Sequence, residues 1–221
     1  MTKSILWLII GYTLFSSSLF AQQIFKGKLS YSVTRFDDPQ KSKILSETQG
    51  YIITNGKKFK HHLVTPQDGK EEAIFEAGKS IAYLVQYKTK EIIKFRLLEE
   101  YRKTDESLTI KRSQTYKNIA GEPAYKVSIY DQDNRMIVDM WVSKNYRWDL
   151  VQLAKYRVKH AFYEISNAYL NGHLILGLKI YNSSGKVAQD VTVQALTPKN
   201  ISDQAFDLPK GFKIIDETKK R

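Results

Sequence analysis

The histidines are the first residues to examine for chemistry, because imidazole is the commonest metal ligand and proton carrier near neutral pH. The chain has four, and only His61 and His62 are adjacent. They lie in a stretch that alternates like a strand, where neighbouring side chains point to opposite faces. His160 and His173 have no HExxH-type partner nearby. The histidines therefore predict no metal site.

Carboxylates are the next candidates, for acid–base work. Glu99-Glu100 and Asp105-Glu106 form two acidic pairs in a charged stretch that is typical of a solvated turn. The sequence holds no Gly-x-Ser-x-Gly motif, no P-loop and no dinucleotide-binding fingerprint. It holds no cysteine, which excludes thiol catalysis, cysteine-bound zinc and disulfides. We therefore expect a protein that is not an enzyme and needs no cofactor.

Large apolar side chains are the residues best suited to a ligand, since small-molecule pockets are mostly apolar with few polar groups. An ordinary hydrophobic core explains the same residues, and the sequence leaves both interpretations open. The residues expected to line a cavity for acyl chains are Tyr83, Ile93, Phe95, Trp141, Leu153 and Phe162. Beside the last two, Lys155, Arg157 and Lys159 either contact anionic headgroups of a membrane or form the solvated side of a core helix.

The elements that must position these residues are mostly strands. In residues 25–36 the apolar side chains Leu29, Tyr31 and Val33 share one face, and Lys and Ser occupy the other. Asn55-Gly56 lies between two strand-like runs and predicts a tight hairpin, because both residues accept a positive φ.

Further strands follow the same period. Residues 71–97 predict a three-stranded meander, in which 80–87 is apolar enough to be buried on both faces. Turn residues and alternation predict later strands at 107–116, 124–130, 135–142, 173–181 and 186–196.

One stretch has a different period. Between Tyr146 and Ala168 there is no Pro or Gly, and apolar residues recur every three or four positions, which predicts an amphipathic helix. Ser143 or Asn145 is its expected N-cap, and Gly172 follows its end. Such a helix must bury its apolar stripe, and the concave face of the sheet is the surface available to it.

The first residues predict export. Lys3 precedes an apolar run from Ile5 to Phe15, and small residues lead to Ala21, as in a signal peptide of residues 1–21. The run is shorter than the roughly 20 residues that span a bilayer. No cysteine follows it for lipid anchoring. We expect residues 22–221 to form a single soluble domain in the periplasm or outside the cell.

The net charge of +12 must be judged against that location. Nucleic acid is a usual partner of a basic cytosolic protein, but export removes it. Anionic lipids, lipopolysaccharide phosphates and acidic proteins remain. Lysines that only protect strand edges from aggregation explain the charge equally well, since Lys and Arg alternate here with apolar residues.

Four segments carry a family resemblance. They are FKGKLSYSV (25–33), NIAGEPAYKVSIYD (118–131), MWVSKN (140–145) and DQAFDLPKGFK (203–213). Their order and spacing resemble an uncharacterised family of secreted bacterial proteins, which itself looks like a relative of the lipoprotein carriers LolA and LolB. The chain departs from that family at Ala124, where many members have a cysteine, so a redox or metal role of that position is absent here.

The resemblance implies a mainly β fold, a single curved antiparallel sheet or half-open barrel with a helical insertion over its concave face. It implies a non-enzymatic binding protein for a lipid or lipoprotein. The alternative is an envelope module for protein–protein interaction, with a filled core and no ligand. In the last segment, Pro209 and Gly211 permit a turn, after which Phe206, Phe212 and Ile214 are expected to pin the terminus onto the sheet.

Overall fold

The computed structural model describes residues 22–36, 44–65, 69–97, 107–148 and 170–219. They form one sheet of thirteen strands and a short 3-10 helix. The elements are β1 (Gln23–Ile24), β2 (Gly27–Phe36), β3 (Ile44–Thr54), β4 (Lys58–Thr65), β5 (Gly69–Glu76), β6 (Ile81–Gln86), β7 (Glu91–Arg96), β8 (Thr109–Ile119), β9 (Glu122–Tyr130), β10 (Met136–Arg147), β11 (His173–Tyr181), β12 (Val187–Pro198), η2 (Asp203–Phe206) and β13 (Lys213–Asp216).

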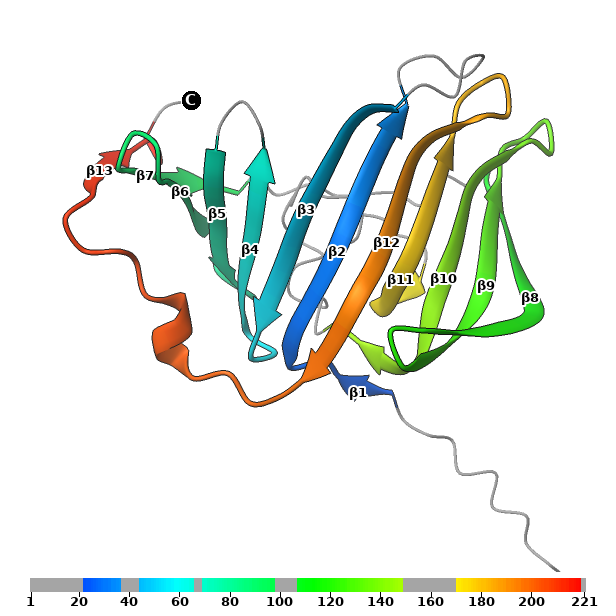
Figure 1. Ribbon diagram of the computed structural model, residues 1–221, viewed down its shortest axis with the longest axis horizontal. Coiled ribbons are helices and arrows are strands. Elements are labelled where there is room, and N and C mark those ends of the chain that lie inside the picture. The colour runs from blue at the N-terminus through cyan, green and yellow to red at the C-terminus, as the bar shows by residue number, and fades with distance from the viewer. Residues whose placement is uncertain (1–21, 37–43, 66–68, 98–106, 149–169, 220–221) are drawn as a thin grey trace, which may run out of the picture.

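The sheet is open and curved, with β13 at one edge and β8 at the other (Figure 1). The strand order is β13-β7-β6-β5-β4-β3-β2-β12-β11-β10-β9-β8, and β1 pairs with β10. Among the described residues, only two strand pairings are parallel, β13 with β7 and β1 with β10. The predicted mainly β class and single curved antiparallel sheet are therefore confirmed, and the sheet does not close into a barrel.

Alternation along the strands gives the sheet two faces. We call the face of Leu29 and Tyr31 the inner face and the face of Ser30 and Ser32 the outer face. The predicted burial of Leu29, Tyr31 and Val33 is confirmed. Burying each large apolar side chain contributes about 1.5–3 kcal/mol. The largest fully buried side chains are Trp148, Tyr31, Phe25, Phe59, Leu29, Ile52, Ile92, Ile129, Met140 and Leu174.

The hairpin predicted at Asn55-Gly56 joins β3 to β4, which confirms it. Of these two turn residues, Gly56 has a positive φ of 94° and Asn55 does not. Asn55 contributes through its side chain, because its Oδ1 accepts the N–H groups of Lys57 (3.0 Å) and Lys58 (2.8 Å). This local bonding is a known reason for the preference of turns for Asn.

The segment that carries the Ile-Ala-Gly resemblance is a second tight hairpin, between β8 and β9. Ala120 (φ 51°) and Gly121 (φ 84°) connect the paired residues Ile119 and Glu122. A positive φ at both central residues is the pattern of a type I′ turn, whose twist matches that of the strands. Ala120 is the less suitable residue there, because a side chain in the left-handed region costs energy.

The C-terminal segment, residues 199–216, crosses the outer face and then adds a strand at the edge of the sheet (Figure 1). Phe206 is buried against Ile74, Val85 and Ile92 on that face. The C-terminal segment thus covers the outer face of the meander of β5, β6 and β7. In β6, Ala82 is buried on the inner side and Val85 on the outer side, while Tyr83 and Leu84 are only partly buried. The expected burial of residues 80–87 on both faces is therefore met in part.

The predicted pinning of the terminus holds for two residues of three. Phe206 is buried, and the ring of Phe212 meets that of Tyr87 edge-on at 5.5 Å. Ile214 is 61% exposed, so its expected role is wrong. It lies in β13, which is held by main-chain pairing with β7 and by an ion pair of Lys94 with Asp216 at 2.9 Å.

The helix predicted for residues 146–168 is wrong at its beginning. Tyr146 and Arg147 belong to β10, and so do both expected N-caps, Ser143 and Asn145. Residues 149–168 lie outside the described residues, and the described part of the chain gives a helical insertion no support. No helix among the described residues is long and apolar enough to cross a membrane.

Candidate binding sites on the two faces of the sheet

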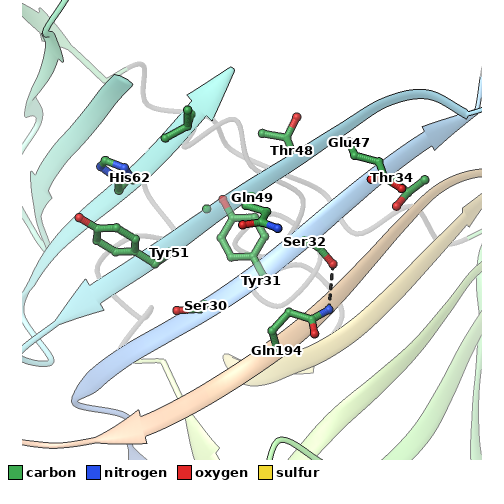
Figure 2. A pocket seen from close by; sticks show the side chains of 12 residues that line it. Ser30, Tyr31, Ser32, Thr34, Glu47, Thr48, Gln49, Tyr51, His62 and Gln194 are labelled. Atoms are coloured by element: carbon green, nitrogen blue, oxygen red, sulfur yellow. Dashed lines mark hydrogen bonds between the residues drawn. The ribbon is translucent and has the colours of Figure 1, made fainter. Parts of the chain in front are cut away.

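A groove of about 610 Å³ lies over β4, β3, β2 and β12 on the outer face (Figure 2). Most of its lining residues carry a hydroxyl, amide or carboxylate group, although polar and apolar atoms contribute about equally to the lining surface. The residues are Ser30, Tyr31, Ser32, Thr34, Glu47, Thr48, Gln49, Gly50, Tyr51, His62, Val64 and Gln194. Of these, Tyr31, Thr48 and Gly50 belong to the inner face by strand register, and the others to the outer face. The volume is ordinary for a small-molecule pocket, and the polar side chains of the lining can form hydrogen bonds to a partner. We call it the outer groove.

Strand register places these polar groups in rows. Residues directly opposite in an antiparallel pair share a face, and the pairs across β2 and β3 are Ser30 with Tyr51, Ser32 with Gln49 and Thr34 with Glu47. A register shift in β12 between Val193 and Ala195 brings in Gln194. Its Nε2 donates to Ser32 Oγ at 2.9 Å.

One wall of the groove is an aromatic stack. The rings of Tyr51 and His62 are nearly parallel, with centroids 4.3 Å apart. The Nζ atom of Lys28 lies 4.3 Å from the centroid of the Tyr51 ring. These contacts occupy the faces of the Tyr51 ring, so a ligand in the groove would meet mainly its edge and hydroxyl.

Behind the stack, Glu72 is buried (4% exposed) among donors. His62 Nδ1 lies 3.2 Å from its Oε1, and the hydroxyl of Tyr87 donates to its Oε2 at 2.8 Å. The Nζ atoms of Lys60 and Lys70 are 3.7 and 3.5 Å from the carboxylate. A buried carboxylate is stable only when partners of this kind compensate its lost hydration.

The pKa shifts assign the charges in this network. Burial raises the pKa of Glu72, but the hydrogen bonds from Tyr87 and His62 and the charges of Lys60 and Lys70 together outweigh burial and leave the pKa below its usual value. Burial, together with the charges of Lys70 and Lys28, lowers the pKa of His62 despite the hydrogen bond and the charge of Glu72. Burial and then the bond to Glu72 raise the pKa of Tyr87 to about 12. At neutral pH Glu72 is charged and its neighbours His62 and Tyr87 are neutral. The Glu72 carboxylate can therefore accept a hydrogen bond from His62 and hold its ring in place.

The inner face of β4, β6 and β7 carries a second candidate surface. Its apolar side chains are only partly buried, and we call them the inner patch: Leu63, Leu84, Ile93 and Phe95. Ile93 pairs with Leu84 across β6 and β7. Leu63 and Phe95 also pack against the main core. A hydrogen bond of 3.0 Å from Gln86 to Glu71 borders the patch.

The structure divides the residues predicted to line one apolar cavity. Ile93 and Phe95 lie together in the inner patch. Tyr83 points to the outer face, where it lines a small cavity of about 190 Å³ with Phe206 and Leu208. Trp141 also lies on the outer face, beneath Lys117.

The remaining predicted site residues lie outside the described residues. They are Leu153 and Phe162 of the cavity and Lys155, Arg157 and Lys159 of the anionic contact. Their roles stay predictions.

The histidines lie as alternation predicts. His61 contacts the hydroxyl of Tyr31 on the inner face, while His62 stacks on the outer face. His173 Nδ1 lies 2.6 Å from the hydroxyl of Tyr125 and 3.0 Å from Nε2 of Gln22. Within the described ranges, no group of three or more His, Cys, Asp or Glu residues is placed to hold a metal ion.

Sequence reasoning missed the outer groove. The polar alternation of Ser30, Ser32 and Thr34 was the available signal, but it equally describes any solvated face. The groove also depends on Gln194, which lies 162 residues from its partner Ser32. Glu72 gave no signal either, because apart from Lys70 in its own strand its partners come from β4 and from Tyr87, which follows β6.

The fold has relatives among known structures. No protein-family model and no curated protein sequence matches the chain. An uncharacterized conserved protein from Thermus thermophilus is similar with a TM-score of 0.51 and 11% identity, over 86% of this chain and 91% of that one.

Two further structures are more distant. The MucA/MucB complex of Pseudomonas aeruginosa matches with a TM-score of 0.47 and 10% identity over 85% of this chain and 58% of the other. A putative outer membrane lipoprotein-sorting protein domain from Vibrio parahaemolyticus matches with a TM-score of 0.36 and 9% identity, over 82% of this chain and 89% of that one. At these identities the likeness concerns the fold alone.

Proposed function

We propose that this protein is a non-enzymatic binding module of the cell envelope that holds an acyl chain of a lipid or lipoprotein against the inner patch. The observation that carries the proposal is the partly exposed apolar surface of Leu84, Ile93 and Phe95 in the interior of an open sheet. Leaving such surface in water costs about 25 cal/mol per Å². An acyl chain covers it without requiring directed hydrogen bonds.

The chemistry of the described residues supports binding over catalysis. The one strongly buried carboxylate beside a histidine, Glu72, is already surrounded by four donors. Its lone pairs are engaged, so it serves to fix His62 and does not accept a proton from a ligand.

The test is binding of a fluorescent fatty acid, together with native mass spectrometry of the protein purified from the periplasm. Ile93→Ser should weaken fatty-acid binding by about tenfold or more, since a buried Ile contributes about 1.5–3 kcal/mol and 1.4 kcal/mol is tenfold. Ile44→Ser is the matched control, because Ile44 is 50% exposed in β3. Absence of any fatty acid on the wild type, or an equal loss in both variants, would contradict the proposal.

The outer groove favours a second candidate function, an interaction module that receives a protein segment. Its lining offers hydroxyls, the amides of Gln49 and Gln194, and the carboxylate of Glu47. A photo-crosslinking residue at Gln49 should then give a discrete adduct in cells, and the same residue at exposed Gln204 should not. Equal labelling at both positions would exclude the groove as the contact.

A further inference from the structure

The edge strand β8 is unusually open for its length. It spans eleven residues, and all but two of them are exposed. Only β9 pairs with it among the described residues, so its other side presents main-chain N–H and C=O groups (Figure 1). Edge strands of this kind can accept a further strand, and proteins usually shorten or shield them.

The cations of β8 rest on aromatic rings. Lys111 Nζ lies 4.3 Å from the ring centroid of Tyr130, Arg112 Cζ 3.9 Å from that of Tyr125, and Lys117 Nζ 4.2 Å from that of Trp141. Cation–π contacts of this kind hold a side chain in place without removing its charge.

None of these three cations forms an ion pair with a carboxylate within the described ranges, although the charges of Asp190 and Asp139 act on Lys117 from farther away. At the opposite edge the lysines are neutralised: Lys94 pairs with Asp216 at 2.9 Å, and Lys213 with Glu91 at 4.0 Å. Burial, and then the nearby charge of Lys179, lower the pKa of Lys117. β8 itself contains no acidic residue. Edge protection by lysine therefore takes a different form at the two edges, and only β8 keeps its positive charge available.

We propose that β8 is a docking strand for an extended acidic segment of a partner protein, which adds to the sheet beside it. Main-chain pairing supplies the affinity in this mode of recognition, and the side chains supply the choice of partner. Exposed Ile110 and Tyr116 offer apolar contacts between the cations. The irregular register between Arg112 and Tyr116 divides the edge into two pairing stretches. An anionic membrane would use the charges but not the free main chain.

The experiment uses fluorescence anisotropy of a labelled peptide of alternating Glu and Val residues. The wild type should bind it, more weakly as salt rises, because salt screens exposed charges. A peptide of the same sequence with N-methylated main chain should bind at least about tenfold less tightly. Equal binding of the two peptides, or no binding of the unmodified one at low salt, overturns the proposal.

Protein variants test the same surface. The triple charge reversal Lys111→Glu, Arg112→Glu and Lys117→Glu should lose at least about tenfold in peptide affinity. The matched control reverses exposed lysines away from β8, at Lys186, Lys199 and Lys210, and changes the net charge equally; it should retain binding. Vesicles of anionic phospholipid test for a membrane site. The proposal is overturned if these vesicles bind the wild type but not the β8 triple variant, and compete equally with the unmodified and the N-methylated peptide.

Discussion

Gly50 in β3 should be hard to replace, because the side chain of Tyr31 lies across it. Gly50 and Tyr31 are directly paired on the inner face of β3 and β2. A Cβ at position 50 would lie 2.6 Å from the hydroxyl oxygen of Tyr31, 2.7 Å from its Cζ and 2.9 Å from the main-chain oxygen of His62. Tyr31 is fully buried and its hydroxyl contacts His61, so the ring has little room to withdraw.

The cost of Gly50→Ala follows from those distances. Overpacking a well-packed core costs about 1–3 kcal/mol, and Ala in place of Gly in a strand returns roughly 0.5–1 kcal/mol. We expect a net loss of about 1–2 kcal/mol in the free energy of unfolding. For a domain of this size 1 kcal/mol shifts Tm by about 2–4 °C, so thermal unfolding by circular dichroism should show a fall of about 2–8 °C.

Two companion variants make the measurement decisive. Gly177→Ala is the control, because its Cβ would meet nothing closer than Trp141 Cδ1 at 3.5 Å, and its Tm should be unchanged or slightly higher. In a Tyr31→Leu background, Gly50→Ala should cost at least about 1 kcal/mol less than in the wild type, which a double-mutant cycle measures. An unchanged Tm for Gly50→Ala, or the same cost in both backgrounds, refutes the steric argument.

Four further outcomes are expected. Ala120→Asn should raise stability in chemical denaturation by about 0.5–1 kcal/mol, because Asn tolerates the left-handed region better than Ala. The lowered pKa of Glu72 contributes stability that is present above its unfolded value and is lost as pH falls through the folded value; Glu72→Gln should therefore flatten the acid limb of a Tm–pH profile. Truncation before Phe206 should lower Tm, because the free energy of unfolding falls by about 1.5–3 kcal/mol for each large side chain that is removed from the interior or uncovered. N-terminal sequencing of exported protein should begin within two residues of position 22; a start at Met1 would contradict the predicted cleavage after Ala21.

Local signals in the sequence were sufficient for the strands and the hairpins. The alternation of Leu29, Tyr31 and Val33 identifies the buried face of a strand, because side chains two positions apart always lie on the same face. Asn55-Gly56 identifies a turn because few residue pairs tolerate its geometry.

The relative phase of neighbouring strands could not be predicted in the same way. Tyr83 and Phe95 both look like cavity residues, yet the hairpin register pairs Phe95 with Ala82 and so places Tyr83 on the other face. A shift of one residue in the turn would reverse that result. The helical period after Tyr146 failed at its start for a related reason: tertiary pairing with β1 and β11 extends β10 to Arg147.

The pairing of β2 with β12 at the centre of the sheet constrains how the chain can fold. These strands lie about 160 residues apart in sequence, Val33 opposite Val191 for example, and they join the meander of β3–β7 to that of β8–β11. Contacts between residues so distant in sequence form slowly, because the loop-closure entropy is lost before the contacts form. During synthesis or translocation from the N-terminus, β2 therefore remains without one neighbour until almost the whole chain has followed. A chaperone that covers β2 in that interval would raise the yield of folded protein.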